Sequence, residues 1–331
     1  MLSDLIRCVV LALLLALGFG GNGSSTRADP LPSWNEGAAK KSITEFVARV
    51  TAQGGVEFVP PELRIATFDN DGTLWAEQPI YFQAAFAIDR AKALVSRDPE
   101  LRKRDVLKAL LKGDRAALAA SGKKGLEEIV AVAHAGVTTE EYAKVVSGWI
   151  TSARHPRFNR PYTELVYQPM LELLAYLRAN GFKTYIVSGG GVEFIRVFAE
   201  CVYGIPPEQV VGSYGATKFQ IGADGKPTLI KLPMVEFIDD GAGKPVAINR
   251  FIGRRPILAF GNSDGDHAML QWTAAGSGAR FMGLVHHTDG EREWAYDRKS
   301  RIGKLDKVLD EANAKGWTVV DMKRDWRRVF P

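Results

Sequence analysis

Cysteine is scarce in this chain, where Cys8 and Cys201 are the only two among 331 residues. So few cysteines exclude a disulfide-built scaffold and the clustered cysteines of a structural zinc site. Charge of one sign is also lacking, because 43 Lys and Arg stand against 38 Asp and Glu, a net charge of +5. The positive charge is spread along the chain and no RNA- or DNA-binding motif accompanies it, so we predict no nucleic-acid partner.

Long apolar runs are missing beyond the N-terminus, and the one at 8–19 is short for a transmembrane helix. It follows the basic Arg7 and precedes a small, polar stretch. Thr26 and Ala28 then supply small residues at the −3 and −1 positions of a cut before Asp29. Residues 1–28 are therefore predicted to be a cleavable signal peptide, the alternative being an uncleaved anchor. We expect a periplasmic or secreted protein with no stable membrane insertion after cleavage.

The rest of the chain alternates strand and helix signals, with one interruption. Residues 65–69 are a short apolar run typical of a buried parallel strand. From 79 to 161 the pattern is helical throughout, and strands and helices then alternate again, with a hairpin signal at 219–232. We predict an α/β fold in which residues 29–78 and 162–331 form the core. Its parallel sheet is flanked by helices, and 79–161 form a helical insertion over the strand ends.

Polar side chains follow the predicted strands or begin a helix at four places. Asp69, Asp71 and Thr73 follow the first strand, Ser188 follows the second, Lys244 begins a helix, and Asn262, Asp264 and Asp266 follow a later strand. Parallel strands end at the same edge of a sheet, so these groups should converge. The chemistry they suit is metal-assisted phosphoryl transfer. Carboxylates hold Mg²⁺, hydroxyl, amide and ammonium groups hold a phosphate, and a carboxylate acts as nucleophile.

The four groups together resemble the motifs of the haloacid dehalogenase (HAD) superfamily, in the same order and strand contexts. Asp69-Asn70-Asp71-Gly72-Thr73 is similar to the first motif, and Ser188 and Lys244 to the second and third. The fourth is Gly261-Asn262-Ser263-Asp264-Gly265-Asp266. The resemblance covers residues 62–290 and implies a Rossmann-like core. The helical insertion resembles the α-helical cap of the phosphoserine-phosphatase-like branch.

This resemblance also implies a role for each matching residue. Asp69 would be the nucleophile and a Mg²⁺ ligand, and Asp71 the general acid and base, with its main-chain carbonyl on the metal. Thr73, Ser188, Gly189 and Lys244 would surround the phosphate. Asn262 and Asp266 would complete the metal site, with Asp264 as a further candidate. Asn262 departs from the family pattern, which has Asp there, and the alternative is that it weakens metal binding.

Two more residues are candidates because they lie close to these motifs. Trp75 follows the first loop and either lines the gap under the insertion or packs as a hinge. His286 ends another predicted strand and either touches the substrate or is structural.

The expected function is a Mg²⁺-dependent phosphatase that hydrolyses a small phosphomonoester through an aspartyl-phosphate. Asp71 favours this over dehalogenation, which needs no such proton donor. The alternatives are a phosphotransferase that uses an acceptor alcohol and a secreted ligand-binding protein without catalysis.

Overall fold

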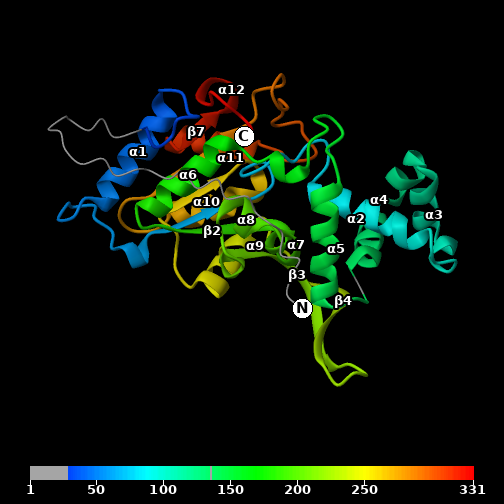
Figure 1. Cartoon of the computed structure of the whole chain (residues 1–331). Coiled ribbons are helices and arrows are strands. Elements are labelled where there is room, and N and C mark those ends of the chain that lie inside the picture. Colours follow the sequence, from blue (N-terminus) through cyan, green and yellow to red (C-terminus); the bar gives the residue numbers. More distant parts are fainter. Residues whose placement is uncertain (1–28, 135) are drawn as a thin grey trace, which may run out of the picture.

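A seven-stranded, mostly parallel sheet forms the centre of the computed structural model, which describes residues 29–134 and 136–331 (Figure 1). The predicted signal peptide at 1–28 therefore lies outside the described residues. The strands are β1 (Ile65–Phe68), β2 (Lys183–Gly191), β3 (Val210–Ile221), β4 (Pro227–Phe237), β5 (Leu258–Gly261), β6 (Phe281–His286) and β7 (Thr318–Asp321). Their order is β4-β3-β2-β1-β5-β6-β7, and only β3 and β4 pair antiparallel. The predicted α/β fold with a parallel sheet is confirmed.

Helices cover both faces of this sheet because successive strand residues point to opposite sides. Leu258 and Phe260 of β5 join one apolar cluster, whereas Ala259 between them joins the other. Buried residues of the first cluster come from α1 (Ala38–Thr51), α6 (Gln168–Ala179), α7 (Val192–Arg196), α8 (Ala199–Tyr203) and α12 (Met322–Asp325). Those of the second come from α9 (Gly243–Ala247), the π-helical turn η5 (Ile248–Ile252), α10 (His267–Ala274) and α11 (Lys307–Lys315). Short 3₁₀ turns complete the core: η1 (Pro61–Leu63), η3 (Tyr162–Glu164), η4 (Pro207–Gln209) and η6 (Asp264–Asp266).

The stretch between β1 and η3 contributes a helical lobe, which we define as residues 82–152. Figure 1 shows it beside the sheet, and its first and last helices add buried residues such as Phe86 and Val146 to the first apolar cluster. It consists of α2 (Phe82–Val95), η2 (Leu101–Lys103), α3 (Asp105–Lys112), α4 (Arg115–His134) and α5 (Thr139–Ser152). Apolar side chains of α2, α3 and α4 form a small core of their own. Gly122 has non-helical angles inside α4, so this helix is kinked there.

The β3–β4 hairpin differs from its prediction in length and projects from the body of the protein (Figure 1). The sequence indicates a strand near 210–214 and a separate hairpin at 219–232. In the structure β3 is continuous, because its first part pairs with β2 while the rest turns away to pair with β4. The hairpin also meets the lobe, where Gly136 N donates to Lys231 O (3.0 Å) and Lys231 N to Val137 O (2.9 Å). Core and lobe are thus joined by main-chain hydrogen bonds as well as by the chain itself.

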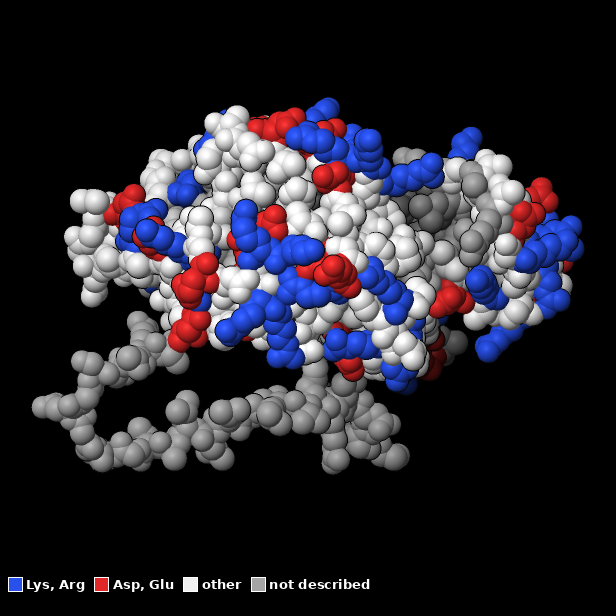
Figure 2. Space-filling model, turned by 90° about the horizontal axis from the view of Figure 1, so that it is seen from above, with Lys and Arg blue, Asp and Glu red and all other residues white. Residues whose placement is uncertain are grey.

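The surface mixes both signs of charge, as the composition predicts. Figure 2 shows basic and acidic side chains side by side over the face in view. Within the described residues, no helix combines the length and the apolar character that a membrane crossing needs.

Candidate active site

The four predicted groups converge at one edge of the sheet because β1 lies between β2 and β5. Asp69 leaves β1 with its N–H donated to Phe260 O of β5, at 3.0 Å. The turn that follows needs Gly72, which has φ +76°. A Cβ on this residue would lie 2.1 Å from Asn262 Nδ2, so only glycine lets the first and fourth loops approach this closely.

Lys244 lies at the centre of this edge, on α9, and only 1% of it is exposed. Its ammonium group donates hydrogen bonds to Asp69 Oδ1 (2.7 Å) and Val187 O (2.8 Å). Asp266 Oδ1 forms an ion pair with it at 2.7 Å but accepts no hydrogen bond. Burial lowers the pKa of Lys244, but Asp266 and Asp69 outweigh this effect and hold it above its usual value. The side chain is therefore a fixed cation between the first and fourth loops.

Negative charge at this edge exceeds what Lys244 can offset. Burial raises the pKa of Asp69 well above its usual value, and Asp266 and Asp71 raise it further against the opposing effect of Lys244. Burial also raises the pKa of the neighbouring Asp239 to about 7. A divalent cation would offset this excess, and hard carboxylate oxygens suit Mg²⁺.

Asp71 is held in place by the indole of Trp75, whose Nε1 donates to Asp71 Oδ1 at 2.9 Å. Trp75 is itself buried, stacked on Phe198 with ring centroids 4.6 Å apart. Trp75 thus positions the Asp71 carboxyl from behind and does not line the cavity. Burial raises the pKa of Asp71 from 3.8 to about 6, although the bond from Trp75 works against this. A carboxyl with this pKa can both donate and accept a proton near neutral pH.

Asn262 joins the two loops by using both ends of its amide. Its Oδ1 accepts from Thr73 Oγ1 (2.9 Å), and its Nδ2 donates to Glu77 Oε1 (2.8 Å). Tyr296 also donates to Glu77 Oε1, at 2.7 Å. Burial, Asp71 and Asp69 raise the pKa of Glu77 well above its usual value, although the bond from Tyr296 lowers it. The hydroxyl of Thr73, expected near the phosphate, is instead committed to Asn262, and Thr73 lies outside the cavity lining.

The two acids of the fourth loop have different surroundings. Asp266 pairs with Lys244 through Oδ1, while its Oδ2 accepts from the main-chain N–H groups of Asn262 (2.9 Å) and Ser263 (3.0 Å). Asp264 points elsewhere, because its Oδ1 accepts from the N–H groups of Asp306 and Val308, both at 3.1 Å, at the start of α11. Asp264 is therefore a helix-capping residue in this structure.

The predicted phosphate loop follows β2 and is tied to the helical lobe. Ser188 is fully buried and its Oγ accepts from Gly190 N at 3.0 Å. Gly189 and Gly190 line the cavity beside Asp69 and Asp71. Gln83 of α2 reaches across and accepts from Gly191 N at 2.6 Å. A movement of the lobe would therefore act directly on this loop.

His286 lies outside the cavity lining, paired with Asp297 at 3.6 Å, and its neighbour His287 points inward instead. His287 Nε2 lies 2.8 Å from Gly72 O and its Nδ1 lies 3.2 Å from Glu293 Oε2. With an acceptor at each ring nitrogen, His287 braces the main chain of the first loop. Alternation along the chain at the end of β6 decides which histidine turns inward. The sequence alone does not tell which of the two faces the first loop.

Two further residues at this edge lack a motif of their own. Asp239 is fully buried near Lys244, and Tyr296 holds Glu77 from a segment far along the chain. In the sequence, Asp239 is indicated only by the Asp239-Asp240-Gly241 stretch just before the Lys244 helix. Nothing local in the sequence indicates Tyr296.

Residues at this edge fit a hydrated Mg²⁺ better than a metal enclosed by protein. Among the described residues, no three or more His, Cys, Asp and Glu side chains form a group that could hold a metal ion. Asp266 Oδ2 accepts main-chain hydrogen bonds, whereas its buried Oδ1 accepts none and can still bind a metal. Asp69 has Oδ2 outside the contact with Lys244, and Asn262 Oδ1 retains a second lone pair. Mg²⁺ commonly keeps several waters and takes one or two carboxylates plus substrate phosphate oxygens.

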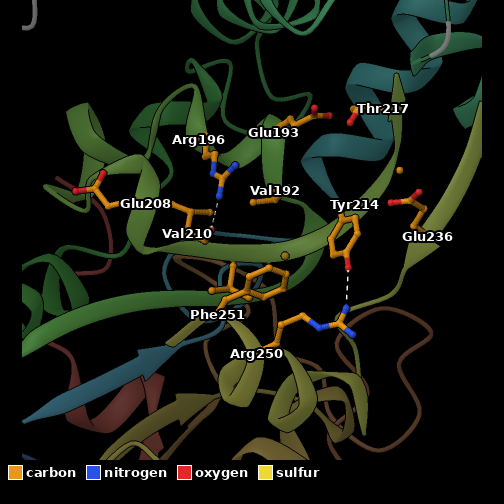
Figure 3. A pocket seen from close by; sticks show the side chains of 13 residues that line it. Val192, Glu193, Arg196, Glu208, Val210, Tyr214, Thr217, Glu236, Arg250 and Phe251 are labelled. Carbon is orange, nitrogen blue, oxygen red and sulfur yellow. Dashed lines mark hydrogen bonds between the residues drawn. The ribbon is translucent and has the colours of Figure 1, made fainter. Parts of the chain in front are cut away.

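Two cavities stand out in the described part of the chain. One, of about 320 Å³, lies between this edge of the sheet and the helical lobe, lined by Asp69, Asp71 and Lys244 on one side and by α2 and α4 on the other. The other, of about 540 Å³, lies over β3 and is drawn in Figure 3. Its arginines are already engaged, Arg196 with Val210 O (3.3 Å) and Arg250 with the Tyr214 hydroxyl (3.1 Å). None of the predicted site residues lines the larger cavity, so the smaller one is the candidate active site.

Comparison with known proteins gives a family and a fold. A family model described as haloacid dehalogenase-like hydrolase matches residues 66–271. The chain is similar to the solved structure of a conserved, functionally unknown protein from Anaerococcus prevotii, at 17% identity and TM-score 0.53, over 85% of this chain and 91% of that one. It is also similar to a protein with unknown function from Bordetella pertussis (18% identity, TM-score 0.47, 78% and 98% covered). A phosphoserine phosphohydrolase-like protein from Francisella tularensis is similar as well, at 18% identity and TM-score 0.36, over 76% of this chain and 99% of that one. No curated protein matches the chain.

The Asn262–Glu77 hydrogen bond predicts that the amide and the carboxyl can exchange positions between these two residues. Asn262→Asp should lower the free energy of unfolding by about 1–3 kcal/mol, because it replaces a buried amide donor with a second carboxyl. Adding Glu77→Gln should restore most of this loss, since Gln can donate to the new Asp. Urea denaturation of both single variants and the double variant, in metal-free buffer, measures the coupling. Strictly additive effects would show that the pair is not coupled.

The raised pKa of Asp71 predicts a pH-dependent stability. Between pH 3.8 and about 6 the folded protein keeps a proton on Asp71 that the unfolded chain has lost. The Asp71 contribution to the free energy of unfolding therefore declines as pH rises through this window. Asp71→Asn has no such proton, so its stability relative to wild type should increase from pH 4 to 6 and then level off. Urea denaturation with a chelator present measures the difference, and a pH-independent difference would contradict the assignment.

Proposed function

The chain belongs to the haloacid dehalogenase-like hydrolases, and from this premise we propose that it is an exported, Mg²⁺-dependent phosphatase acting on a small phosphomonoester. The observation that carries the proposal is the Asp69–Lys244–Asp71 arrangement. It combines a buried carboxylate fixed by a cation with a second carboxyl whose pKa is raised to about 6. Nucleophile and proton donor have different surroundings, which is how paired carboxyl groups divide acid and nucleophilic roles.

In the first step Asp69 attacks the phosphorus atom of the ester. A bond forms between phosphorus and the carboxylate oxygen, the bond to the ester oxygen breaks, and Asp71 gives its proton to the departing alcohol. Lys244 offsets charge on Asp69 and on the transferring group. The N–H group of Gly189 and the hydroxyl of Ser188 are suited to bind the phosphate oxygens.

In the second step water attacks phosphorus and releases inorganic phosphate. Asp71, now ionised, takes the proton from the water, and the bond between Asp69 and phosphorus breaks. Both carboxyl groups return to their starting states. Trp75 keeps Asp71 in one orientation through both transfers, since its indole N–H donates to the carboxylate.

Mg²⁺ would be held by the Asp69 carboxylate, the main-chain carbonyl of Asp71 and the Asn262 side-chain oxygen. It would supply positive charge that stabilises the phosphoryl group during transfer. Asp266 holds the fourth loop through Oδ2, and its Oδ1, which accepts no hydrogen bond, would be a further ligand. In this proposal Asn262 does not abolish metal binding, because Mg²⁺ accepts neutral oxygen ligands as well as carboxylates.

Asp69→Asn should abolish hydrolysis of p-nitrophenyl phosphate, by about 10³-fold or more, because the amide is a poor nucleophile. Release of p-nitrophenol with and without Mg²⁺ measures this. Asp264→Asn is the matched control, since an amide oxygen can still accept from Asp306 N and Val308 N and activity should remain within about threefold. Full activity of Asp69→Asn would overturn the mechanism.

Export is proposed from the pattern of residues 1–28, with cleavage before Asp29. Protein recovered from a bacterial periplasm or culture medium should begin with Asp29-Pro30-Leu31. N-terminal sequencing or intact mass measures this. Retention of the first 28 residues on the recovered protein would contradict it.

A further inference from the structure

The 320 Å³ cavity has two halves, which correspond to the two halves of a phosphate ester. Asp69, Asp71 and Gly189 lie on the side where the phosphate would bind, and Tyr81, Ala84 and Val130 lie on the side of the helical lobe. The alcohol must occupy the second half, because Asp71 has to reach the oxygen between the two. At the small end of ligand pockets, this volume suits an alcohol of only a few carbon atoms.

Positive charge is missing from the half that would hold the alcohol. Lys244 is the only Lys or Arg among the described residues that line the cavity, and its charge is already paired with Asp69 and Asp266. His134 adds none, since burial lowers its pKa to about 4 and leaves the ring neutral at pH 7. A carboxylate on the alcohol would therefore be buried without a cationic partner, which costs several kcal/mol.

Negative and aromatic groups, by contrast, are available there. The side chain of Asp240 lines the cavity, is exposed, and has no ion-pair or hydrogen-bond partner among the described residues. It lies beside the phosphate loop, with Oδ1 3.8 Å from where a Cβ on Gly189 would be. Tyr81 lines the same cavity and is 40% exposed, so its ring is open to a ligand.

An ammonium group is the ligand chemistry that suits this half of the cavity. It can pair with the Asp240 carboxylate, and the face of an aromatic ring such as Tyr81 attracts cations. We propose that the substrate is the phosphate ester of a small alcohol that carries an ammonium group and no carboxylate, with Asp240 and Tyr81 as the residues that select it. This inference rests on the proposed phosphatase function and names its substrate class.

Matched esters test the charge preference directly. Phosphocholine is compared with 3,3-dimethylbutyl phosphate, its uncharged isostere, and phosphoethanolamine with phosphoserine, which adds one carboxylate. We expect kcat/KM to be at least about tenfold higher for phosphocholine than for its isostere. The value for phosphoserine should be about 100-fold below that for phosphoethanolamine. Equal values within the first pair, or a preference for phosphoserine, would overturn the proposal.

Variants then test the two residues. Asp240→Asn should reduce kcat/KM for phosphocholine about tenfold more than for the isostere, and Tyr81→Leu should also reduce the preference. Tyr81→Phe is the matched control, because it keeps the ring and should keep the preference. Thermal melting followed by circular dichroism checks that each variant is folded. A preference that survives both Asp240→Asn and Tyr81→Leu would show that other groups select the substrate.

Binding to the Asp69→Asn variant separates this inference from the proposed function. Calorimetric titration of the four esters into this variant, with Mg²⁺ present, gives Kd values without turnover. If wild type hydrolyses no ester but the Kd values follow the expected order, the phosphatase proposal fails and the ligand preference stands. If hydrolysis occurs but the Kd values and kcat/KM show no preference for the ammonium esters, the substrate class is wrong.

Discussion

A single buried cation holds this edge of the sheet together. Lys244 is buried, so its charge needs partners within the protein. Asp69 and Val187 accept its hydrogen bonds and Asp266 forms an ion pair with it, at 2.7–2.8 Å. These partners come from the ends of three neighbouring strands or the loops that follow them. The need to pair one ammonium group therefore fixes the first and fourth loops relative to β2. It also leaves Asp69 oriented, which a nucleophile requires.

A second set of contacts reinforces the first loop from behind. Asn262 links Thr73 to Glu77, Tyr296 supports Glu77, Trp75 holds Asp71, and His287 braces the Gly72 carbonyl. The four supporting side chains, those of Asn262, Tyr296, Trp75 and His287, do not line the cavity. Their buried hydrogen bonds keep Asp71 and the main chain of the first loop in one geometry. The excess of acid that remains is what a Mg²⁺ ion would offset.

The helical lobe and the core share the cavity, so the proposed catalytic groups and the proposed selecting groups come from different parts of the protein. The core supplies the carboxyl groups and Lys244, whereas α2, α4 and the loop carrying Asp240 surround the half of the cavity assigned to the alcohol. Gln83 ties α2 to the phosphate loop by a 2.6 Å hydrogen bond. Selection of the alcohol is thereby coupled to the loop expected to bind the phosphate, and changes in the lobe can alter specificity without touching Asp69 or Asp71.

The sequence by itself determined the local structure and the family. Apolar runs and helical periodicity predict the strands and the helical insertion, because each depends on neighbours within a few residues. The resemblance drawn from four short motifs is confirmed by the match over 66–271. Only the tertiary structure decided which side chains meet. Glu77 and Asn262 are 185 residues apart, and Thr73 turns to Asn262 rather than to the phosphate. His287 rather than His286 faces inward, and Asp264 caps α11, because strand register and loop packing bring partners from distant segments that no local pattern records.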